Sequence, residues 1–436
     1  MLDDINEQLG NDKIKFVDLW FTDIFGTLKN ITVTHSHFQS SVERGIWFDG
    51  SSIEGFARIQ ESDMILMPDI STYAILPWTK EGKKTARFIC DVLNPDGTPF
   101  EGDPRYILKR QIKEAADLGL KYDTGPEIEF FLFGRDKYGS VIPVPHDIGG
   151  YFDASGKDLA SEVRNDISLC LEMMGIDMEA VHHEVAPGQH EIDFKYDWAL
   201  QSADKVITAK QTIKIIAQMY GLYATFMPKP VNGENGSGMH VHQSLKTMDG
   251  KSAFYNSTDK YKLSNIAKNF IEGQLTYAKN MIAILAPTVN SYKRLVPGYE
   301  APINICWGQT NRSVLIRIPR YSPGREQSTR CELRCPDPSA NPYLAFAVML
   351  GTGLVGIQLD LNIRNAIDNN SYNNNSIKHL PECLKDALDE MSKRPLIENI
   401  LGKHTFKKYI TAKNEEWISY KTSVTDWEIN EYLDSI

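Results

Sequence analysis

The 436-residue chain lacks the features that would place it in a membrane or outside the cell. Its longest apolar run, from Leu344 to Leu359, is interrupted by glycines and a glutamine, and it is shorter than the roughly 20 apolar residues that cross a bilayer. The first residues, Met1 to Asn6, lack the basic and apolar parts of a signal peptide, and the six cysteines show no regular spacing. These absences predict a reduced, cytoplasmic protein with no membrane span.

Positive charge is also scarce. The chain has 47 lysines and arginines against 57 aspartates and glutamates, which gives a formal net charge of −10. This balance argues against a general binder of nucleic acid or of anionic membranes, because both carry negative charge, but it leaves room for a local basic pocket. We therefore expect no nucleic-acid partner. A chain of this length ordinarily forms two domains.

The first hundred residues have the pattern of a small β-rich domain. Alternating apolar and polar residues predict strands at residues 16–21, 31–34 and 85–92. A turn cluster follows, and Asp103 and Pro104 then form the start signal of a helix. We place the domain boundary near Gly102, which gives domains of residues 1–102 and 103–436.

The second part of the chain alternates strand patterns with longer helical patterns. The helical patterns lie at residues 159–174, 203–219 and 263–286, and they predict an α+β fold. The glycines from Gly351 to Gly356 match a dinucleotide motif literally, but they continue a helical run instead of following a strand, so helix packing explains them better. Cys331 and Cys335 are assigned to the apolar back of a strand. The asparagine-rich stretch 369–376 predicts a surface loop.

The most informative pattern is a set of short strand-like segments in which charged or imidazole side chains alternate with apolar ones. Successive side chains of a strand point to opposite faces. Glu127 and Glu129 therefore share one face, and Ile128 and Phe130 share the other. Two further segments repeat this alternation, with His240 and His242 in one and with Arg330, Glu332 and Arg334 in the other.

Each such segment alone is weak evidence, because alternating charge is most often the solvated outer face of an antiparallel sheet. The segment 182–193 adds Glu184 and Glu191, with a Pro-Gly turn between them that can bring one carboxylate beside the other. Together the segments suggest a sheet wrapped around a polar cavity. Carboxylates and imidazoles suit Mg²⁺ or Mn²⁺, and arginines suit phosphate and carboxylate groups. The combination indicates metal-assisted phosphoryl chemistry.

These segments also carry a resemblance to a known family. The chain resembles the type I glutamine synthetases nearly from end to end, through motifs that follow the family order at residues 48–52, 127–129, 182–191, 235–242, 290–295, 311–313, 317–319 and 332–338. Within that family it is most similar to the alpha subtype, which glutamine inhibits directly and which is not adenylylated. The resemblance implies a β-grasp N-terminal domain, a larger catalytic domain with a curved antiparallel sheet, and a homo-dodecamer of two stacked hexamers.

The resemblance also implies which residues form the site. One Mg²⁺ or Mn²⁺ ion would be held by Glu129, Glu184 and Glu191, and a second by Glu127, His240 and Glu332, with two or three ions per active site. Asn235, Gly236 and Arg294 would contact the substrate glutamate, and Arg294 would bind its α-carboxylate. Arg312 and Arg334 would neutralise the negative charge of the phosphoryl group. The positions implied for ATP are Glu179, Phe194, Lys195, Tyr196, His242, Ser244 and Arg317.

The reaction implied by the resemblance is ATP-dependent amidation. The γ-carboxylate of glutamate takes the γ-phosphoryl group of ATP, and ammonia then displaces phosphate. Ammonium must be bound as a cation and must lose a proton before it attacks. The resemblance assigns this work to Glu300 and to Asp49 from a neighbouring subunit. Without the resemblance, the more common interpretation of either residue is an acidic side chain that is solvated in a surface loop.

Regulation and alternative functions complete these expectations. An arginine at the place of Arg58 transmits glutamine inhibition in the subtype that the chain resembles, and the context of Tyr372 differs from the adenylylation loop, so we predict no adenylylation there. A PII-type or transcriptional regulator is a kind of partner that the resemblance leaves open. Two alternatives stay open as well: a γ-glutamyl amine or polyamine ligase, and an inactive sensor or structural paralogue. The presence of Asp49 and Glu300 argues against the first.

Overall fold

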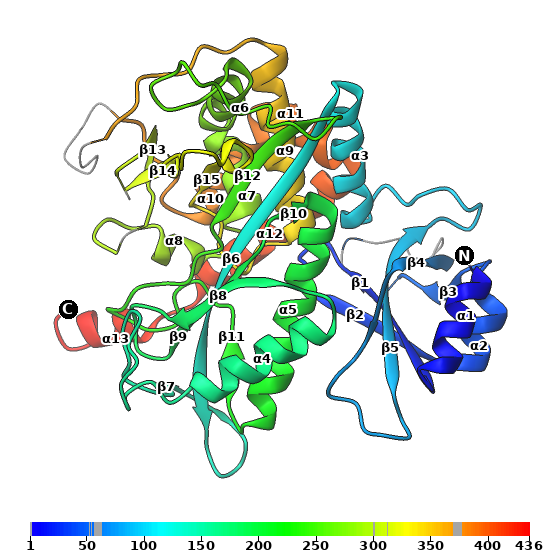
Figure 1. Cartoon of the computed structure of the whole chain (residues 1–436). Coiled ribbons are helices and arrows are strands. Elements are labelled where there is room, and N and C mark those ends of the chain that lie inside the picture. Colours follow the sequence, from blue (N-terminus) through cyan, green and yellow to red (C-terminus); the bar gives the residue numbers. More distant parts are fainter. Residues whose placement is uncertain are drawn as a thin grey trace.

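The computed structural model describes residues 2–51, 53, 55, 63–299, 301–311, 313–368 and 377–436. Two sheets organise the molecule, a smaller one near the N-terminus and a larger one in the remainder of the chain (Figure 1). The mixture of strands and helices confirms the expected α+β class. No helix among the described residues is long and apolar enough to cross a membrane.

The N-terminal sheet has five strands, and the three strands predicted for this part are confirmed. Their order is β2 (Leu28–Thr34), β1 (Phe16–Thr22), β5 (Thr85–Leu93), β4 (Asp63–Ile75) and β3 (Ile46–Asp49). β1 and β5 run parallel, and the other neighbouring pairs run antiparallel. Helices α1 (Leu2–Asn11) and α2 (His35–Ser41) pack on the sheet, and Phe38 of α2 stacks on Phe88 of β5 with the ring centroids 4.9 Å apart.

The large sheet is centred on one long strand, β6 (Leu120–Arg135). Its main path runs in the order β13 (Asn304–Gly308), β14 (Val314–Arg317), β15 (Cys331–Leu333), β12 (Val241–Thr247), β6, β9 (Gln189–Phe194) and β8 (Met178–His183). Three short strands also pair with β6: β7 (Val141–Pro145), β10 (Asp197–Trp198) and β11 (Tyr223–Thr225). All of these pairs are antiparallel except β13 with β14, which agrees with the expected antiparallel sheet.

Helices cover the large sheet on the side of the main hydrophobic core (Figure 1). They are α3 (Pro104–Asp117), α4 (Ser161–Met173), α5 (Ala199–Met219), α6 (Asn265–Thr276), α7 (Ala278–Leu285), α8 (Ser291–Arg294), α9 (Pro342–Gln358), α10 (Leu384–Ser392), α11 (Leu396–Leu401) and α12 (Lys403–Thr422). The last helix, α13 (Asp426–Tyr432), contributes no residue to this core. α3 begins at the predicted cap, where the Asp103 carboxylate accepts the Arg105 N–H at 3.0 Å. The helical pattern predicted at residues 263–286 is confirmed, but it forms two helices, because the chain leaves the helical region at Tyr277 (φ −103°).

Close helix packing explains the glycines of α9. A Cβ at Gly353 would lie 2.2 Å from the Phe270 ring, and one at Gly356 would lie 2.1 Å from the Asn269 carbonyl oxygen. Both contacts are with α6, so the glycines allow the two helices to approach closely. This confirms the prediction that the glycine motif belongs to helix packing. Cys331 and Cys335 are buried, as the strand pattern predicted.

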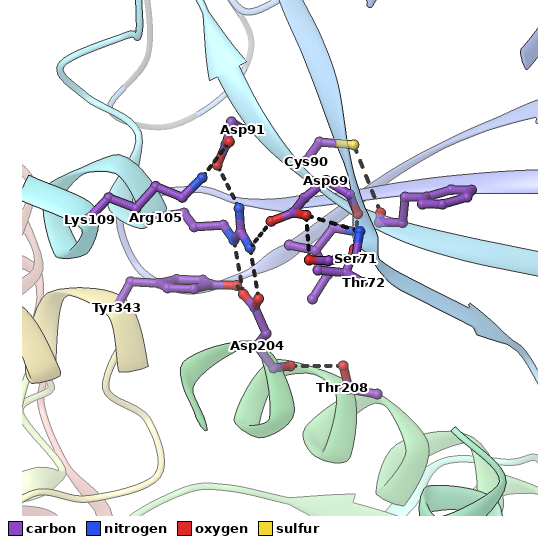
Figure 2. A network of polar contacts seen from close by, with 12 residues as sticks. Asp69, Ser71, Thr72, Cys90, Asp91, Arg105, Lys109, Asp204, Thr208 and Tyr343 are labelled. Atoms are coloured by element: carbon purple, nitrogen blue, oxygen red, sulfur yellow. Dashed lines mark hydrogen bonds and ion pairs between the residues drawn. The ribbon is translucent and has the colours of Figure 1, made fainter. Parts of the chain in front are cut away.

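A buried ionic network centred on Arg105 joins the N-terminal sheet to the helices of the larger part (Figure 2). The Arg105 side chain is 3% exposed and forms ion pairs with Asp69 of β4 at 2.8 Å, Asp91 of β5 at 2.7 Å and Asp204 of α5 at 2.9 Å. The Tyr343 hydroxyl of α9 donates to Asp204 at 2.6 Å. One guanidinium group therefore connects two strands of the N-terminal sheet with the helical layer behind the large sheet.

Candidate active site

A cavity of about 380 Å³ gathers charged side chains from the strands of the large sheet. All six residues predicted to hold metal line it: Glu127, Glu129, Glu184, Glu191, His240 and Glu332. Five of the predicted substrate residues line it too: Asn235, Gly236, Arg294, Arg317 and Arg334. The structure thus brings together side chains that are more than 200 positions apart in the sequence.

The strand period of two explains how β6 delivers its carboxylates. Ile128 and Phe130 are fully buried in the main core, while Glu127 and Glu129 line the cavity on the opposite face. The segment before and within β12 works in the same way, because Met239 and Val241 are buried in the core and His240 lines the cavity. The polar face of the sheet was therefore predicted correctly from the alternation alone.

The first group in the cavity consists of Glu129, Glu184 and Glu191. One carboxylate oxygen of each residue lies within 4.8 Å of a carboxylate oxygen of the other two. Glu129 and Glu191 are direct partners across β6 and β9, and Glu184 follows the end of β8. Burial and the charge of Glu184 raise the pKa of Glu129 to about 8, and burial with the charge of Glu129 raises the pKa of Glu191 far above its usual range.

The second group consists of Glu127, His240 and Glu332. His240 Nδ1 lies 3.1 Å from a Glu127 oxygen and 3.7 Å from a Glu332 oxygen. Burial alone would raise the pKa of Glu127, but the hydrogen bonds from His240 and His242 outweigh it and hold this pKa well below its usual range. His242 Nε2 lies 2.8 Å from Glu127 Oε1, so this histidine also contacts the group.

The chemistry of both groups fits divalent metal ions. All their donor atoms are carboxylate oxygens or imidazole nitrogens, which suit Mg²⁺ and Mn²⁺. In the first group, three acids lie close together, and burial with mutual repulsion raises the pKa of Glu129 and of Glu191, so negative charge there needs a proton or a cation to balance it. The residues of the two groups therefore fit the two metal sites that the family resemblance implies.

Three arginines complete the lining of the cavity. Arg317 and Arg334 both form ion pairs with Glu332. Arg294 donates to the carbonyl oxygens of Cys335 at 3.0 Å and of Arg334 at 3.1 Å, which fixes the direction of its guanidinium group. A Cβ at position 238 would lie 2.5 Å from Arg294 Nη2, so Gly238 is required where the arginine passes beside the chain.

The affinity of the first group for Mn²⁺ is expected to fall as the pH drops, and most steeply below about 8. The pKa of Glu129 is about 8 without metal, so below that pH an incoming ion must displace a proton from this carboxyl group, and above it the carboxylate is already ionised. We expect a loss of up to about tenfold for each pH unit and each displaced proton. Titration of Mn²⁺ at several pH values measures this, and an affinity independent of pH would contradict it.

The remaining predicted site residues do not all reach this cavity. Asp49 is exposed at the end of β3, where it accepts the Ser51 N–H at 2.8 Å. Of the residues predicted to contact ATP, Arg317 lines the cavity and the others are not among the described residues that line it. The Phe194 side chain is buried in the main core. Glu300, Arg312 and Arg58 lie outside the described residues.

Other residues that line the cavity were assigned no role in the sequence analysis, and two of them contact the first group. Gln189 Nε2 donates to Glu129 Oε2 at 2.9 Å and to the Gly236 carbonyl oxygen at 3.1 Å, so it fixes one of the carboxylates. His182 Nε2 lies 3.7 Å from Glu191 Oε1. The strand period offered a signal for Gln189, because it lies two positions before Glu191 on the same face of β9.

The two sheets and this cavity define a class of protein, one whose cavity lining of carboxylates, an imidazole and three arginines suits divalent cations and anionic groups. Comparison with family models specifies the class further. Residues 13–95 match the glutamine synthetase beta-grasp domain, and residues 101–432 match the glutamine synthetase catalytic domain. The chain therefore belongs to the glutamine synthetase family.

Similar proteins match along the whole chain. The glutamine synthetase of Thermotoga maritima is 49% identical over 439 residues and 99% of both chains, and that of Thermus thermophilus is 49% identical over 441 residues, 99% of this chain and 98% of the relative. A solved GmaS/ADP complex has a TM-score of 0.90 at 31% identity, over 98% of this chain and 99% of that one. A Plasmodium falciparum glutamine synthetase shares the fold, with a TM-score of 0.89 at 24% identity over 99% and 98% of the two chains.

Proposed function

We propose that this protein is a glutamate–ammonia ligase, which converts L-glutamate, ammonium and ATP into L-glutamine, ADP and phosphate. The observation that carries the proposal is the single cavity that collects both acidic groups and three arginines. Full-length identity of about half to glutamine synthetases from several organisms supports it. In the organism, such an enzyme assimilates nitrogen.

The chemistry of the cavity suits the first half of this reaction. A carboxylate is a poor acyl donor until it carries a leaving group, so the γ-carboxylate of glutamate first takes a phosphoryl group from ATP. Bound Mg²⁺ or Mn²⁺ ions at the two acidic groups would neutralise phosphate oxygens. Arg317 and Arg334 hold their guanidinium groups at the same place, where they can bind the anionic oxygens. Arg312 is assigned the same task.

Nucleotide and glutamate are assigned to different parts of the site. The proposed nucleotide contacts are Glu179, Phe194, Lys195, Tyr196, His242, Ser244 and Arg317. The structural neighbour solved with ADP supports a nucleotide site on this fold. Because the Phe194 side chain is buried, this residue would contribute through its main chain. Asn235, Gly236 and Arg294, which line the cavity, are proposed to hold the amino-acid end of glutamate.

Ammonium requires a separate carboxylate pair. A carboxylate binds the cation and accepts a proton from it, which leaves ammonia with a free electron pair to attack the acyl phosphate. We assign this to Glu300 and to Asp49. Because Asp49 is exposed and does not line the cavity of its own chain, it would act in the site of a neighbouring subunit.

The proposed function is tested by phosphate release from ATP with glutamate, comparing ammonium with methylamine and putrescine. We expect turnover with ammonium, formation of glutamine, and loss of both after chelation of the metal. Turnover with an organic amine only would make the protein an amine ligase, and no turnover with any amine would favour an inactive paralogue. Either result would refute the proposal.

Substitution of Arg294 by lysine is expected to raise the KM for glutamate by about 10–100-fold. The planar guanidinium group can bind the α-carboxylate with two parallel hydrogen bonds, and lysine cannot, which costs about 1.5–3 kcal/mol. Steady-state kinetics with varied glutamate measures this. The KM for ATP is the internal control and should change little. A KM for glutamate within twofold of wild type would show that Arg294 does not bind this substrate.

A homo-dodecamer of two stacked hexamers is the proposed assembly. The position of Asp49 supports subunits that complete one another's sites. The C-terminal segment also exposes apolar side chains, with Trp427 63%, Leu433 72% and Ile436 98% exposed. Exposed apolar surface of this kind favours burial by a partner. Mass photometry of the full chain and of a chain ending at Ser423 tests the assembly, and we expect smaller particles from the shortened chain.

Regulation is proposed to follow the subtype that glutamine inhibits directly. Arg58 would transmit the inhibition, and Tyr372 would not be adenylylated, although both lie outside the described residues. Arg58→Ala should abolish inhibition by glutamine without abolishing turnover, and unchanged inhibition would end this proposal. Six free cysteines support a reducing, cytoplasmic location. A PII-type or transcriptional regulator is the proposed kind of protein partner.

A further inference from the structure

The hairpin that carries Glu184 and Glu191 rests on two fully buried ionisable side chains. Asp147 and His183 are both 0% exposed in their side chains, and His183 Nε2 lies 2.9 Å from Asp147 Oδ1. Neither residue lines the cavity. His183 ends β8 and immediately precedes Glu184, while Asp147 lies in the connection between β7 and α4.

The two glutamates differ in how the sheet holds them. Glu191 lies within β9, opposite Glu129 of β6, so the strand pairing fixes its position. Glu184 lies beyond the end of β8, in the turn that leads to β9. Its place beside the other two carboxylates therefore depends on the conformation of the turn 184–188.

Asp147 holds both ends of this turn. Its Oδ1 atom faces His183 Nε2 and also accepts the Gly188 N–H at 2.8 Å. His183 Nδ1 in turn lies 2.6 Å from the carbonyl oxygen of Glu184. Gly188 has a positive φ of 66°, so the turn takes a backbone form that other residues rarely adopt. The carboxylate thus connects the last residue of β8 with the residue before β9.

Two oxygen atoms face the ring of His183. Nδ1 faces a backbone carbonyl oxygen and Nε2 faces a carboxylate oxygen, so both ring nitrogens are engaged in contacts with the protein. Asp147, His183 and His190 bring their atoms within 4.8 Å of one another, but these contacts already occupy both nitrogens of His183.

We propose that Asp147 and His183 are positioning residues that fix the Glu184 carboxylate as a metal ligand. The inference rests on the proposed function, because it assumes that Glu129, Glu184 and Glu191 hold an ion. The pair touches neither the ion nor a substrate. It acts through the backbone of the turn, and loss of such supporting contacts typically weakens metal binding by about 10–100-fold.

Binding of Mn²⁺ to the full-length protein without ATP or glutamate tests the inference, with free Mn²⁺ followed by electron paramagnetic resonance. Wild type should bind two ions per subunit. Asp147→Ala and His183→Leu should weaken one of these by about 10–100-fold and leave the other unchanged. Glu332→Gln removes a ligand of the second group, so it identifies which class of ions each variant affects.

Two control variants separate positioning from general destabilisation. His183→Gln keeps an N–H group that can reach Asp147, so it should restore most of the affinity. Ile213→Ala removes buried side-chain volume from α5, an element outside the hairpin, and should lower the melting temperature without changing either affinity. Unchanged Mn²⁺ binding in Asp147→Ala and His183→Leu, or equal weakening of both ions, would overturn the inference. No Mn²⁺ binding by wild type would instead refute the metal sites of the proposed function.

Discussion

Substitution of Glu129 by glutamine is expected to lower kcat by about 1000-fold or more with little change in the fold. Glu129 Oε2 accepts hydrogen bonds from Gln189 at 2.9 Å and from the Gly238 N–H at 2.9 Å. The carbonyl oxygen of a glutamine can accept both bonds, so the packing survives. Its NH₂ group then replaces Oε1, the oxygen that accepts neither of these bonds, and a donor cannot bind a cation. Loss of charge stabilisation worth several kcal/mol corresponds to this fall in rate.

The measurement is steady-state turnover at saturating ATP, glutamate, ammonium and metal, together with Mn²⁺ binding. Glu172→Gln is the matched control, because Glu172 is exposed on α4 and the same change of charge there should leave kcat unchanged. The melting temperature should stay close to that of wild type in both variants. A Glu129→Gln enzyme with at least a third of the wild-type kcat would show that this group does not hold a catalytic ion.

The strands of the site could be predicted from the sequence because their two faces have opposite chemistry. Ile128 and Phe130 must reach the core, and the period of two then leaves Glu127 and Glu129 on the other face. This argument needs no information about the rest of the chain. The resemblance to a family added what periodicity cannot give, namely which carboxylates from separate strands gather in the same group.

Other features depend on contacts between distant segments, so local patterns did not reveal them. Asp147 and His183 are 36 positions apart, and nothing in either segment marks them as partners. The bend at Tyr277 was also missed, because the apolar periodicity continues from α6 into α7 on both sides of the break. The tyrosine ring packs against the Arg394 guanidinium group at 5.3 Å, a contact that only the folded chain provides.

The Arg105 network leads to the largest expected effect on stability. Substitution of Arg105 by methionine, which keeps much of the side-chain volume, should lower the free energy of unfolding by about 3–5 kcal/mol. The reason is that Asp69, Asp91 and Asp204 would lose their shared cation at once, and Asp204 would stay buried on α5. Removal of one member of a buried ion pair costs more than the pair contributes, because the remaining charge is neither hydrated nor compensated.

Lys109→Met is the matched control for this substitution. Lys109 pairs with Asp91 at 2.5 Å, but its side chain is 32% exposed, so its loss should cost at most about 1 kcal/mol. Denaturant titration of both variants, followed by tryptophan fluorescence, gives the comparison. Asp204→Asn in the Arg105→Met background should recover part of the lost stability, because it removes the buried uncompensated charge. Equal midpoints for Arg105→Met and Lys109→Met would show that the network does not hold the N-terminal sheet against the helical layer.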